Sequence, residues 1–290
     1  MNGAYTEVKS FKWPSPAKLN LFLHIVGRRP DGYHLLQSIF RFTNLCDFIN
    51  YEILESEIIK RSSDNSGIRE QDDLVIRAAN LLKEKSNSKL GVNISILKNI
   101  PIGGGLGGGS SNAATTLVAL NHLWKIGLST DELAEIGLSL GADIPFFIHG
   151  NTAWVEGIGE ELTSIELDGC FYLIVYSGHS VSTRAVFEAD DLTRNTPRIT
   201  IRDFFDGNSK NDCEEYVRNY YGDVGEALDW LSKYVDAQLT GTGGCLFAKF
   251  KSEKMANDVE DKLPPKWKGY VVTGINKSPL LRKLEDEQRH

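Results

Sequence analysis

The sequence is poor in the features that mark secreted, membrane-spanning and metal-binding proteins. Its 290 residues include only four cysteines, which are widely spaced and form no C-x-x-C pair. We therefore expect reduced, buried thiols rather than disulfides or a cysteine metal site. No apolar run reaches about 18 residues and the N-terminal segment is polar, so neither a membrane span nor a signal peptide is expected. These absences favour a cytoplasmic protein.

Positive charge is also scarce. The chain has 32 Lys and Arg against 39 Asp and Glu, which gives a formal net charge of −7. Such a balance provides no general attraction to nucleic acids or anionic membranes, so neither is expected as a partner. The length suits one large or two moderate domains. We expect small-molecule substrates, and a monomer or weak homodimer.

Glycine, in contrast, is concentrated in one stretch, PIGGGLGGGSSNAATT, at residues 101–116. Glycine tolerates positive φ and allows a close backbone approach, so several N–H groups can converge on one anion. Residues 92–97 before the stretch alternate as a strand, and a helix follows it up to Gly127, with caps expected among Ser110, Ser111 and Asn112. An anion is favoured at a helix N-terminus, so the pattern predicts a phosphate-binding loop.

Two common phosphate loops fit this stretch poorly. A P-loop needs a lysine directly after the last glycine, where this chain has Ser110. A dinucleotide fingerprint fits Gly103, Gly105 and Gly108 in spacing, but no acidic residue follows a second strand about 20 positions on. The stretch instead closely resembles the ATP loop of the GHMP kinases, the family of galactokinase, homoserine kinase, mevalonate kinase and phosphomevalonate kinase.

Three other segments carry the same resemblance. PSPAKLNLFL, within residues 13–40, is typical of a strand and places Lys18 and Asn20 on one face. A turn and the letters GRRPDGYH follow, which resemble one branch of the family whose acceptor alcohol carries a cytidine diphosphate group. GADIPFF contains Asp143, and LTGTGGCLFAKF at 239–250 resembles the third family motif. The resemblance extends from Trp13 to Leu281.

The resemblance implies a set of ATP-binding residues. The glycine loop would hold the triphosphate, with Ser110 or Ser111 helping to hold Mg²⁺, and the third motif would pack beside it. The family usually has D-N-L where this chain has Asp72, Asp73 and Leu74, and an ionised carboxylate only accepts hydrogen bonds at the adenine edge. The implied ATP-binding residues are Pro101, Ile102, Gly103, Gly104, Gly105, Leu106, Gly107, Gly108, Gly109, Ser110, Ser111 and Asp73, with Gly241, Gly243 and Gly244 in the third motif.

The catalytic and acceptor residues are likewise implied by the resemblance. Asp143 would be the general base and Lys18 its partner, while Tyr33 and Phe187 would hold a cytosine ring between them. On spacing alone, the same residues also fit ordinary core, surface or turn positions, and His149 has no metal-ligand partner at a usable spacing. The implied acceptor-binding residues are Asn20, Tyr33, His34, Phe40, Thr183 and Phe187.

The resemblance implies an α+β GHMP kinase fold with two domains. Residues 1–157 would form an N-terminal domain like the second domain of ribosomal protein S5, and residues 158–290 a ferredoxin-like C-terminal domain. The implied activity is transfer of the γ-phosphoryl of ATP to a hydroxyl of a cytidine diphosphate sugar-alcohol, in the non-mevalonate route to isoprenoid precursors. Two alternatives remain: phosphorylation of a small alcohol such as mevalonate or homoserine, and a sensor that has lost catalysis.

Overall fold

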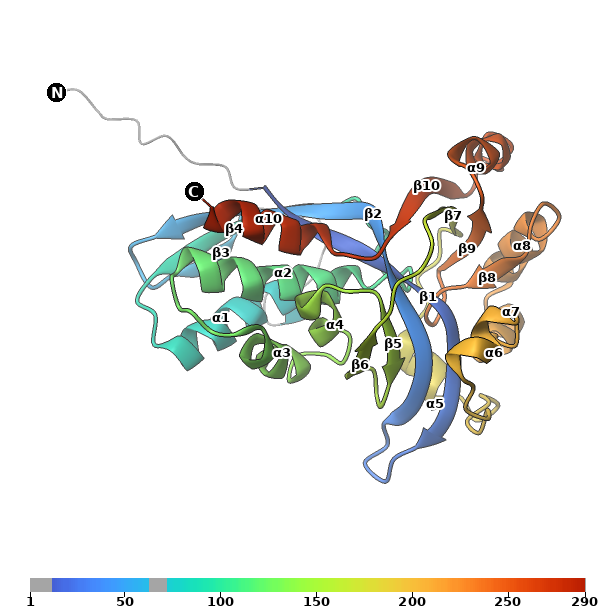
Figure 1. Ribbon diagram of the computed structural model, residues 1–290, viewed down its shortest axis with the longest axis horizontal. Helices are drawn as coiled ribbons and strands as arrows, with labels where there is room; N and C mark the ends of the chain where they lie inside the picture. Colours follow the sequence, from blue (N-terminus) through green and yellow to red (C-terminus); the bar gives the residue numbers. More distant parts are fainter. Residues whose placement is uncertain (1–11, 63–71, 290) are drawn as a thin grey trace.

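A computed structural model describes residues 12–62 and 72–289 of the chain. The sequence predicts a loose lead-in at residues 1–11 and a polar loop at 61–71, and all of the first and most of the second lie outside these residues. One ten-stranded sheet runs through both halves of the molecule in the order β3-β4-β2-β10-β7-β9-β8 (Figure 1). Three further strands lie off this path, because β1 and β5 pair with β2 and β6 pairs with β5. The two halves therefore share a backbone hydrogen-bond network.

A long antiparallel hairpin, β1 (Lys12–Arg28) and β2 (His34–Leu54), forms the spine of this sheet. Its turn is the predicted one, with Gly32 at φ +93° donating its N–H to the carbonyl of Arg29 at 3.0 Å. The sequence predicted shorter strands. Both faces of β1 and β2 are largely covered, so the strands extend well past the segments whose alternation was visible.

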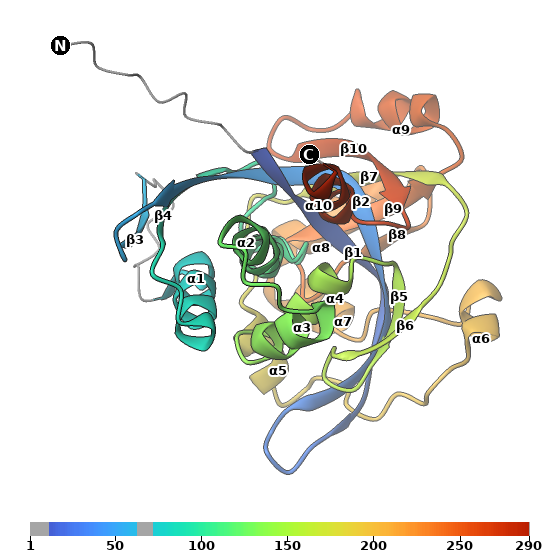
Figure 2. The ribbon, with the colours of Figure 1, turned by 60° about the vertical axis from the view of Figure 1, so that its left-hand side comes forward.

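Four helices cover the concave side of the hairpin, as Figure 2 shows. They are α1 (Leu74–Ser86), α2 (Gly108–Leu123), α3 (Thr130–Leu138) and α4 (Ile144–His149), and they pack with strands β3 (Ile59–Arg61) and β4 (Gly91–Leu97). The sequence predicts Asp72 or Asp73 as the cap of the first helix, and the structure has Asp73 capping α1. The spacing of Ser129 and Glu132 predicts a capping box, which these two residues form on α3.

The predicted start of α2 was wrong. Helix α2 begins at Gly108, and its N-cap is Gly107 at φ +71°, with no side-chain cap. Ser110, Ser111 and Asn112 therefore lie within the first five residues of the helix, and both Ser111 and Asn112 are buried. The helix also ends at Leu123, before the turn at Gly127. The glycine loop thus runs directly into the helix, and its last N–H groups belong to the helix terminus.

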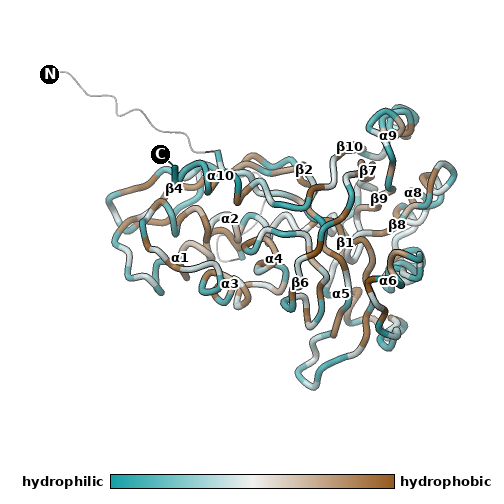
Figure 3. The backbone as a smooth tube through the Cα atoms, in the orientation of Figure 1, coloured by the Kyte–Doolittle hydropathy of each residue, from teal (hydrophilic) through white to brown (hydrophobic). Residues whose placement is uncertain are grey.

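The second half contains its own core of strands and helices. Figure 3 shows that the outer helices α9 and α10 are mostly hydrophilic. In the described residues, no helix has the length and apolar character needed to cross a membrane.

The strands of the second half of the chain are β5 (Ala153–Glu156), β6 (Glu161–Ser164), β7 (Cys170–Tyr176), β8 (Ala237–Leu239), β9 (Cys245–Phe250) and β10 (Lys268–Ile275). The helices are α5 (Thr183–Glu188), α6 (Ile201–Phe205), α7 (Glu214–Tyr220), α8 (Gly222–Leu231), α9 (Glu253–Glu260) and α10 (Pro279–Gln288).

The end of the chain returns to the first half. Strand β10 pairs with β2 at Gly274 and Thr43, and the following helix α10 buries Leu280 in the first core. The four cysteines are buried free thiols, in line with the sequence expectation. Burial raises the pKa of the Cys46 and Cys213 thiols to about 12, which keeps them protonated and unreactive.

Candidate active site

A cavity of about 890 Å³ lies where the glycine loop, the β1–β2 hairpin, the start of α1 and helix α5 meet. This volume is in the range of small-molecule sites, roughly 300–1,000 Å³. Nearly all of the site residues predicted from the sequence line it; those that do not are Ser111, Gly243 and Gly244. Ser111 is fully buried and its hydroxyl oxygen accepts a hydrogen bond from Ser15 at 2.8 Å, so only Ser110 of the serine pair reaches the cavity.

The glycine loop packs backbone against backbone on a second glycine segment, which is the third family motif at residues 239–250. Gly103, Gly105 and Gly107 all have positive φ, between +70° and +78°. A Cβ on Gly105 would lie 2.4 Å from the carbonyl oxygen of Thr240, and the N–H of Cys245 donates to the carbonyl of Gly104 at 3.0 Å. Only glycine permits this approach. The two glycine segments therefore hold each other in one conformation.

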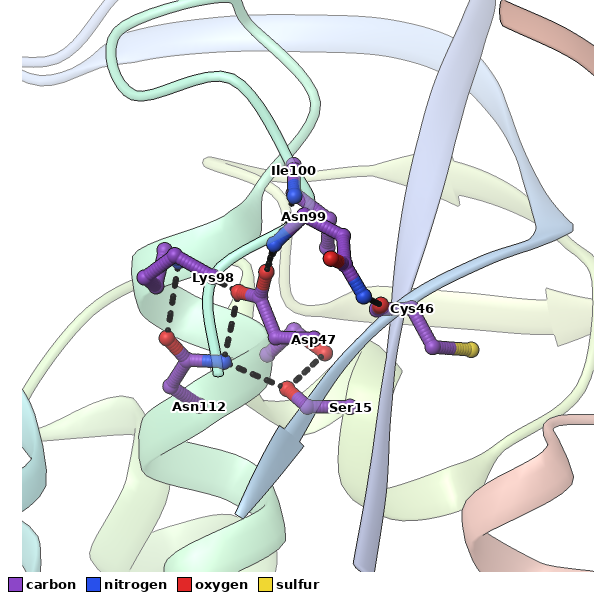
Figure 4. Close-up of polar contacts among 8 residues, drawn as sticks. Ser15, Cys46, Asp47, Lys98, Asn99, Ile100 and Asn112 are labelled. Atoms are coloured by element: carbon purple, nitrogen blue, oxygen red, sulfur yellow. Dashed lines mark hydrogen bonds and ion pairs between the residues drawn. The ribbon is translucent and has the colours of Figure 1, made fainter. Parts of the chain in front are cut away.

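A buried carboxylate fixes the start of the glycine loop (Figure 4). Asp47 on β2 is fully buried, and one carboxylate oxygen accepts the backbone N–H groups of Asn99 and Ile100 at 2.8 and 2.9 Å. The other oxygen accepts the side-chain amide of Asn112 at 3.0 Å and pairs with the ammonium of Lys98. Both Lys98 and Asn112 line the cavity. Asp47 thus ties the loop entry to the N-terminal part of α2.

Sequence reasoning missed Asp47, although a signal was present. The alternation along residues 47–51 places it on the same face as Ile49 and Tyr51, which are both buried. A charged residue in phase with buried neighbours needs several hydrogen bonds, and this one has them.

Lys18 and Asp143 meet in the floor of the cavity. The Lys18 ammonium lies 3.4 Å from the Asp143 carboxylate, and the two side chains are 5% and 32% exposed. Lys18 also donates to the Asn20 side-chain oxygen and stands 4.1 Å from the ring centroid of Phe40. Burial lowers the pKa of Lys18, and the neighbouring Asp143 partly opposes this shift. The Lys18 ammonium therefore has little contact with water, whereas the Asp143 carboxylate next to it reaches the cavity.

The position of Asp143 leaves its carboxylate available. It is the N-cap residue of α4, yet its side chain makes no capping hydrogen bond. The backbone N–H of Lys18 donates to the carbonyl of Leu106 at 3.0 Å, so β1 fastens the lysine and the glycine loop to each other. The pair and the loop are therefore held in one fixed relation.

The far end of the cavity is aromatic. Tyr33, at the hairpin turn, is 57% exposed, and Phe187 lies on α5, which Ser182 caps. The ring stacked on Phe187 is His34, with centroids 5.0 Å apart and an angle of 28° between planes. Thr183 shares a hydrogen bond of 2.9 Å with Thr242 of the second glycine segment. The predicted acceptor residues thus come from both halves of the chain and line one cavity, with Asn20 and Phe40 next to Lys18 in its floor.

The carboxylate of Asp73 already has protein partners. It accepts the N–H of Val75 at 2.9 Å as the cap of α1, and it is ion-paired with Arg61. Asp73 still lines the cavity. Any contact with a nucleotide base therefore has to be shared with these partners.

Two family models and many relatives match the chain. The GHMP kinases N terminal domain matches residues 73–151, and the GHMP kinases C terminal domain matches residues 195–269. A 4-diphosphocytidyl-2-C-methyl-D-erythritol kinase of Alkalilimnicola ehrlichii is 49% identical over 276 residues, with 95% of each chain covered. One from Nitrosococcus oceani is 50% identical over 273 residues, covering 94% of this chain and 98% of the relative.

Solved structures agree with this. A 4-(cytidine 5'-diphospho)-2C-methyl-D-erythritol kinase crystal structure superposes with a TM-score of 0.79 at 27% identity, covering 91% of this chain and 99% of the other. The mevalonate kinase of Methanococcus jannaschii, at 17% identity and a TM-score of 0.68, shares the fold. The expected α+β GHMP kinase fold is confirmed. The chain is a kinase that belongs to the GHMP family and, within it, to the 4-diphosphocytidyl-2-C-methyl-D-erythritol kinases.

Proposed function

We propose that this kinase transfers the γ-phosphoryl group of ATP to the 2-hydroxyl of 4-diphosphocytidyl-2-C-methyl-D-erythritol, a step of the non-mevalonate route to isoprenoid precursors. Asp143 acts as the general base and Lys18 assists it. The observation that carries the proposal is the 3.4 Å Lys18–Asp143 pair, set between a glycine-rich phosphate loop and an aromatic cluster in a single cavity.

The glycine loop suits a triphosphate. It ends in the N-terminus of α2, a helix of 16 residues, whose first N–H groups and macrodipole favour negative charge. The chain as a whole is acidic, so these local donors have to supply the attraction. The ammonium of Lys98, which is paired with Asp47, lies 3.5 Å from a Cβ placed on Gly108 and so stands beside the loop.

In this proposal Asp143 takes the proton of the acceptor hydroxyl. Its side chain is partly exposed to the cavity, and Lys18 gives it a counter-charge. In phosphoryl transfer the protein mainly positions the reactants and stabilises charge, and a fixed ammonium serves both purposes. Lys18 thus supports the carboxylate before transfer and the phosphoryl oxygens during it.

A magnesium ion fits this site as part of a nucleotide complex. When bound, it would spread the charge on the transferring phosphoryl group. Mg²⁺ is usually held by few protein oxygens together with phosphates, and the hydroxyl of Ser110 is the oxygen of the serine pair that lines the cavity. Among the described residues, no cluster of three His, Cys, Asp or Glu side chains could hold a metal by itself.

The acceptor occupies the other end of the cavity. A flat cytosine ring is stabilised by aromatic faces, and Tyr33 and Phe187 come from the two halves of the chain. Asn20 and Thr183 provide polar groups, and Phe40 lies beneath the Lys18 ammonium, where it shapes the floor. The reacting hydroxyl would then lie next to Asp143, between the two ends.

A coupled assay of ADP release with a panel of acceptor alcohols tests the proposal. The enzyme should turn over with 4-diphosphocytidyl-2-C-methyl-D-erythritol and not with mevalonate or homoserine. Turnover of a small alcohol without a nucleotide would instead favour the small-alcohol alternative. ATP binding without turnover of any acceptor would favour a sensor.

A further inference from the structure

Arg194 makes an unusual set of contacts next to the aromatic end of the cavity. It lies in the segment that follows α5, and its Nε–H donates to Nε2 of His34 at 3.0 Å. Its other donors go to backbone carbonyls, including that of Phe187 at 3.1 Å. The remaining carbonyl partners are those of Ala189, Leu192 and Asp190.

These contacts are hydrogen bonds to neutral acceptors rather than ion pairs. In the parts of the chain that the structure describes, no carboxylate forms an ion pair with Arg194, and its side chain does not line the cavity. A guanidinium offers five donors in a fixed planar fork. Arg194 uses these donors to connect His34, at the start of β2, to backbone carbonyls at the end of α5 and in the segment after it.

The contact with Arg194 determines which nitrogen of His34 carries the proton. A guanidinium only donates hydrogen bonds, so Nε2 of His34 has to be the unprotonated acceptor. Neutral imidazole then carries its proton on Nδ1. Burial, together with the charges of Arg194 and Arg28, lowers the pKa of His34 and keeps the ring neutral at pH 7.

Nδ1–H is consequently the group that His34 can offer to a ligand. His34 lines the cavity, and Nδ1 has no hydrogen-bond partner among the described residues. The imidazole is stacked on Phe187, whose own carbonyl is held by Arg194. One guanidinium thus sets both the donor and the aromatic face at this end of the cavity.

We propose that Arg194 is a positioning residue that makes the acceptor site selective for cytosine over uracil, by presenting His34 as an Nδ1–H donor beside the ring of Phe187. The inference rests on the proposed function. Cytosine has an acceptor at N3, which fits an N–H donor, whereas N3 of uracil carries a hydrogen and opposes it. A site built to hydrogen-bond one partner rejects the mismatched one strongly, because its own polar group is left unpaired.

Binding of CDP and UDP measured by calorimetry tests the proposal without any turnover. The wild-type protein should bind CDP more tightly than UDP. Arg194→Ala should lose that preference and weaken CDP by about 10- to 150-fold, equivalent to about 1.5–3 kcal/mol for a hydrogen bond that involves a charged group. Arg198→Ala is the matched control, because Arg198 lies in the same segment but pairs with Glu156. It should leave both affinities within about twofold, since exposed ion pairs contribute little.

Nitrogen NMR of the His34 ring gives a second test, because it reports the tautomer of His34, which would not change if Arg194 only stabilised the fold. Long-range ¹H–¹⁵N spectra should show the Nδ1–H tautomer in the wild type. In Arg194→Ala they should show mixed tautomers and a His34 pKa that rises toward about 6.5. The His34 resonances are assigned by their absence in His34→Gln. Arg194→Lys, which keeps the charge but loses the fork, should reproduce the mixed tautomers and serves if the alanine variant does not fold.

Side-chain geometry allows a rescue test. The amide nitrogen of an asparagine lies near the Nδ1 position, whereas that of a glutamine lies near Nε2. His34→Asn should therefore retain more CDP preference than His34→Gln. An Nε2–H tautomer in the wild type, or an unchanged CDP-to-UDP ratio in Arg194→Ala, would overturn the proposal. Tight, selective CDP binding without kinase turnover would instead support the role of Arg194 and count against the proposed function.

Discussion

The contact between the two glycine segments predicts that Gly105→Ala is far more damaging than its size suggests. Gly105 has φ +78°, and an added Cβ would lie 2.4 Å from the backbone oxygen of Thr240 and 3.1 Å from that of Gly243. The left-handed conformation costs an alanine about 1–2 kcal/mol. Because the opposing atoms are backbone, the segments have to separate, which adds about 1–3 kcal/mol. The expected loss of stability is about 2–5 kcal/mol.

Gly127→Ala is the matched control. Gly127 has nearly the same φ, +84°, but nothing lies within 4 Å of its would-be Cβ. The change should cost only the backbone strain of about 1–2 kcal/mol. Both substitutions stiffen the unfolded chain equally, so that contribution cancels in the comparison. The difference between the two variants isolates the contact between the glycine segments.

Urea unfolding and calorimetric titration with ATP measure the two consequences. Gly105→Ala should unfold at clearly lower urea than Gly127→Ala and should bind ATP at least about tenfold more weakly, equivalent to about 1.4 kcal/mol. Gly127→Ala should bind ATP normally. If the two variants were equally stable and bound ATP equally well, the claim that the interlocked backbones shape the phosphate site would be refuted.

Three further predictions concern the ends and the base of the cavity. Phe187→Ala should raise the KM of the cytidine acceptor by about 5- to 150-fold, because ring stacking on a base contributes roughly 1–3 kcal/mol. The KM of ATP should not change, and an equal rise in both KM values would contradict the aromatic clamp formed by Tyr33 and Phe187. Asp47→Asn should lower the free energy of unfolding by about 3–5 kcal/mol. The substitution leaves Lys98 without its buried partner and directs an N–H of the new amide toward other donors. A urea midpoint near that of the wild type would argue against the role of Asp47. Burial lowers the pKa of Lys18, so its ammonium is lost at a lower pH than that of an exposed lysine; kcat should fall on the alkaline side below about pH 10.4, and Lys18→Arg, which stays charged, should remove that decline while reducing kcat.

The parts of the fold predicted from the sequence are those set by neighbouring residues. A cap at Asp72 or Asp73, a capping box at Ser129 and a strand at Cys170–Tyr176 were predicted, and the structure has the first cap at Asp73. Such features can be predicted because a cap is a hydrogen bond over two or three residues and a strand shows its own apolar pattern. The start of α2 was not predicted. Serines are favoured N-caps, but Gly107 already supplies the turn, and Ser111 is buried against Ser15.

The candidate site was predicted where a motif carried it and missed where distant segments meet. The glycine loop, Lys18 and Asp143 came from short motifs, and the structure places them in one cavity. Asp47 binds the N–H of Asn99, which is 52 positions away, and Arg194 binds His34, which is 160 positions away. No local pattern connects such residues. The two-domain boundary at 157/158, the oligomeric state and the individual site roles stay predictions.

The kcat of Asp143→Asn, measured beside the ATP affinity of the same variant, tests the central claim most directly. The substitution keeps the shape of the side chain beside Lys18 and removes the base, and a general base contributes about 10²–10⁴ in rate. We expect kcat with 4-diphosphocytidyl-2-C-methyl-D-erythritol to fall by that factor while ATP binds as in the wild type, because the glycine loop is unchanged. A variant that kept most of its kcat would show that Asp143 is not the base.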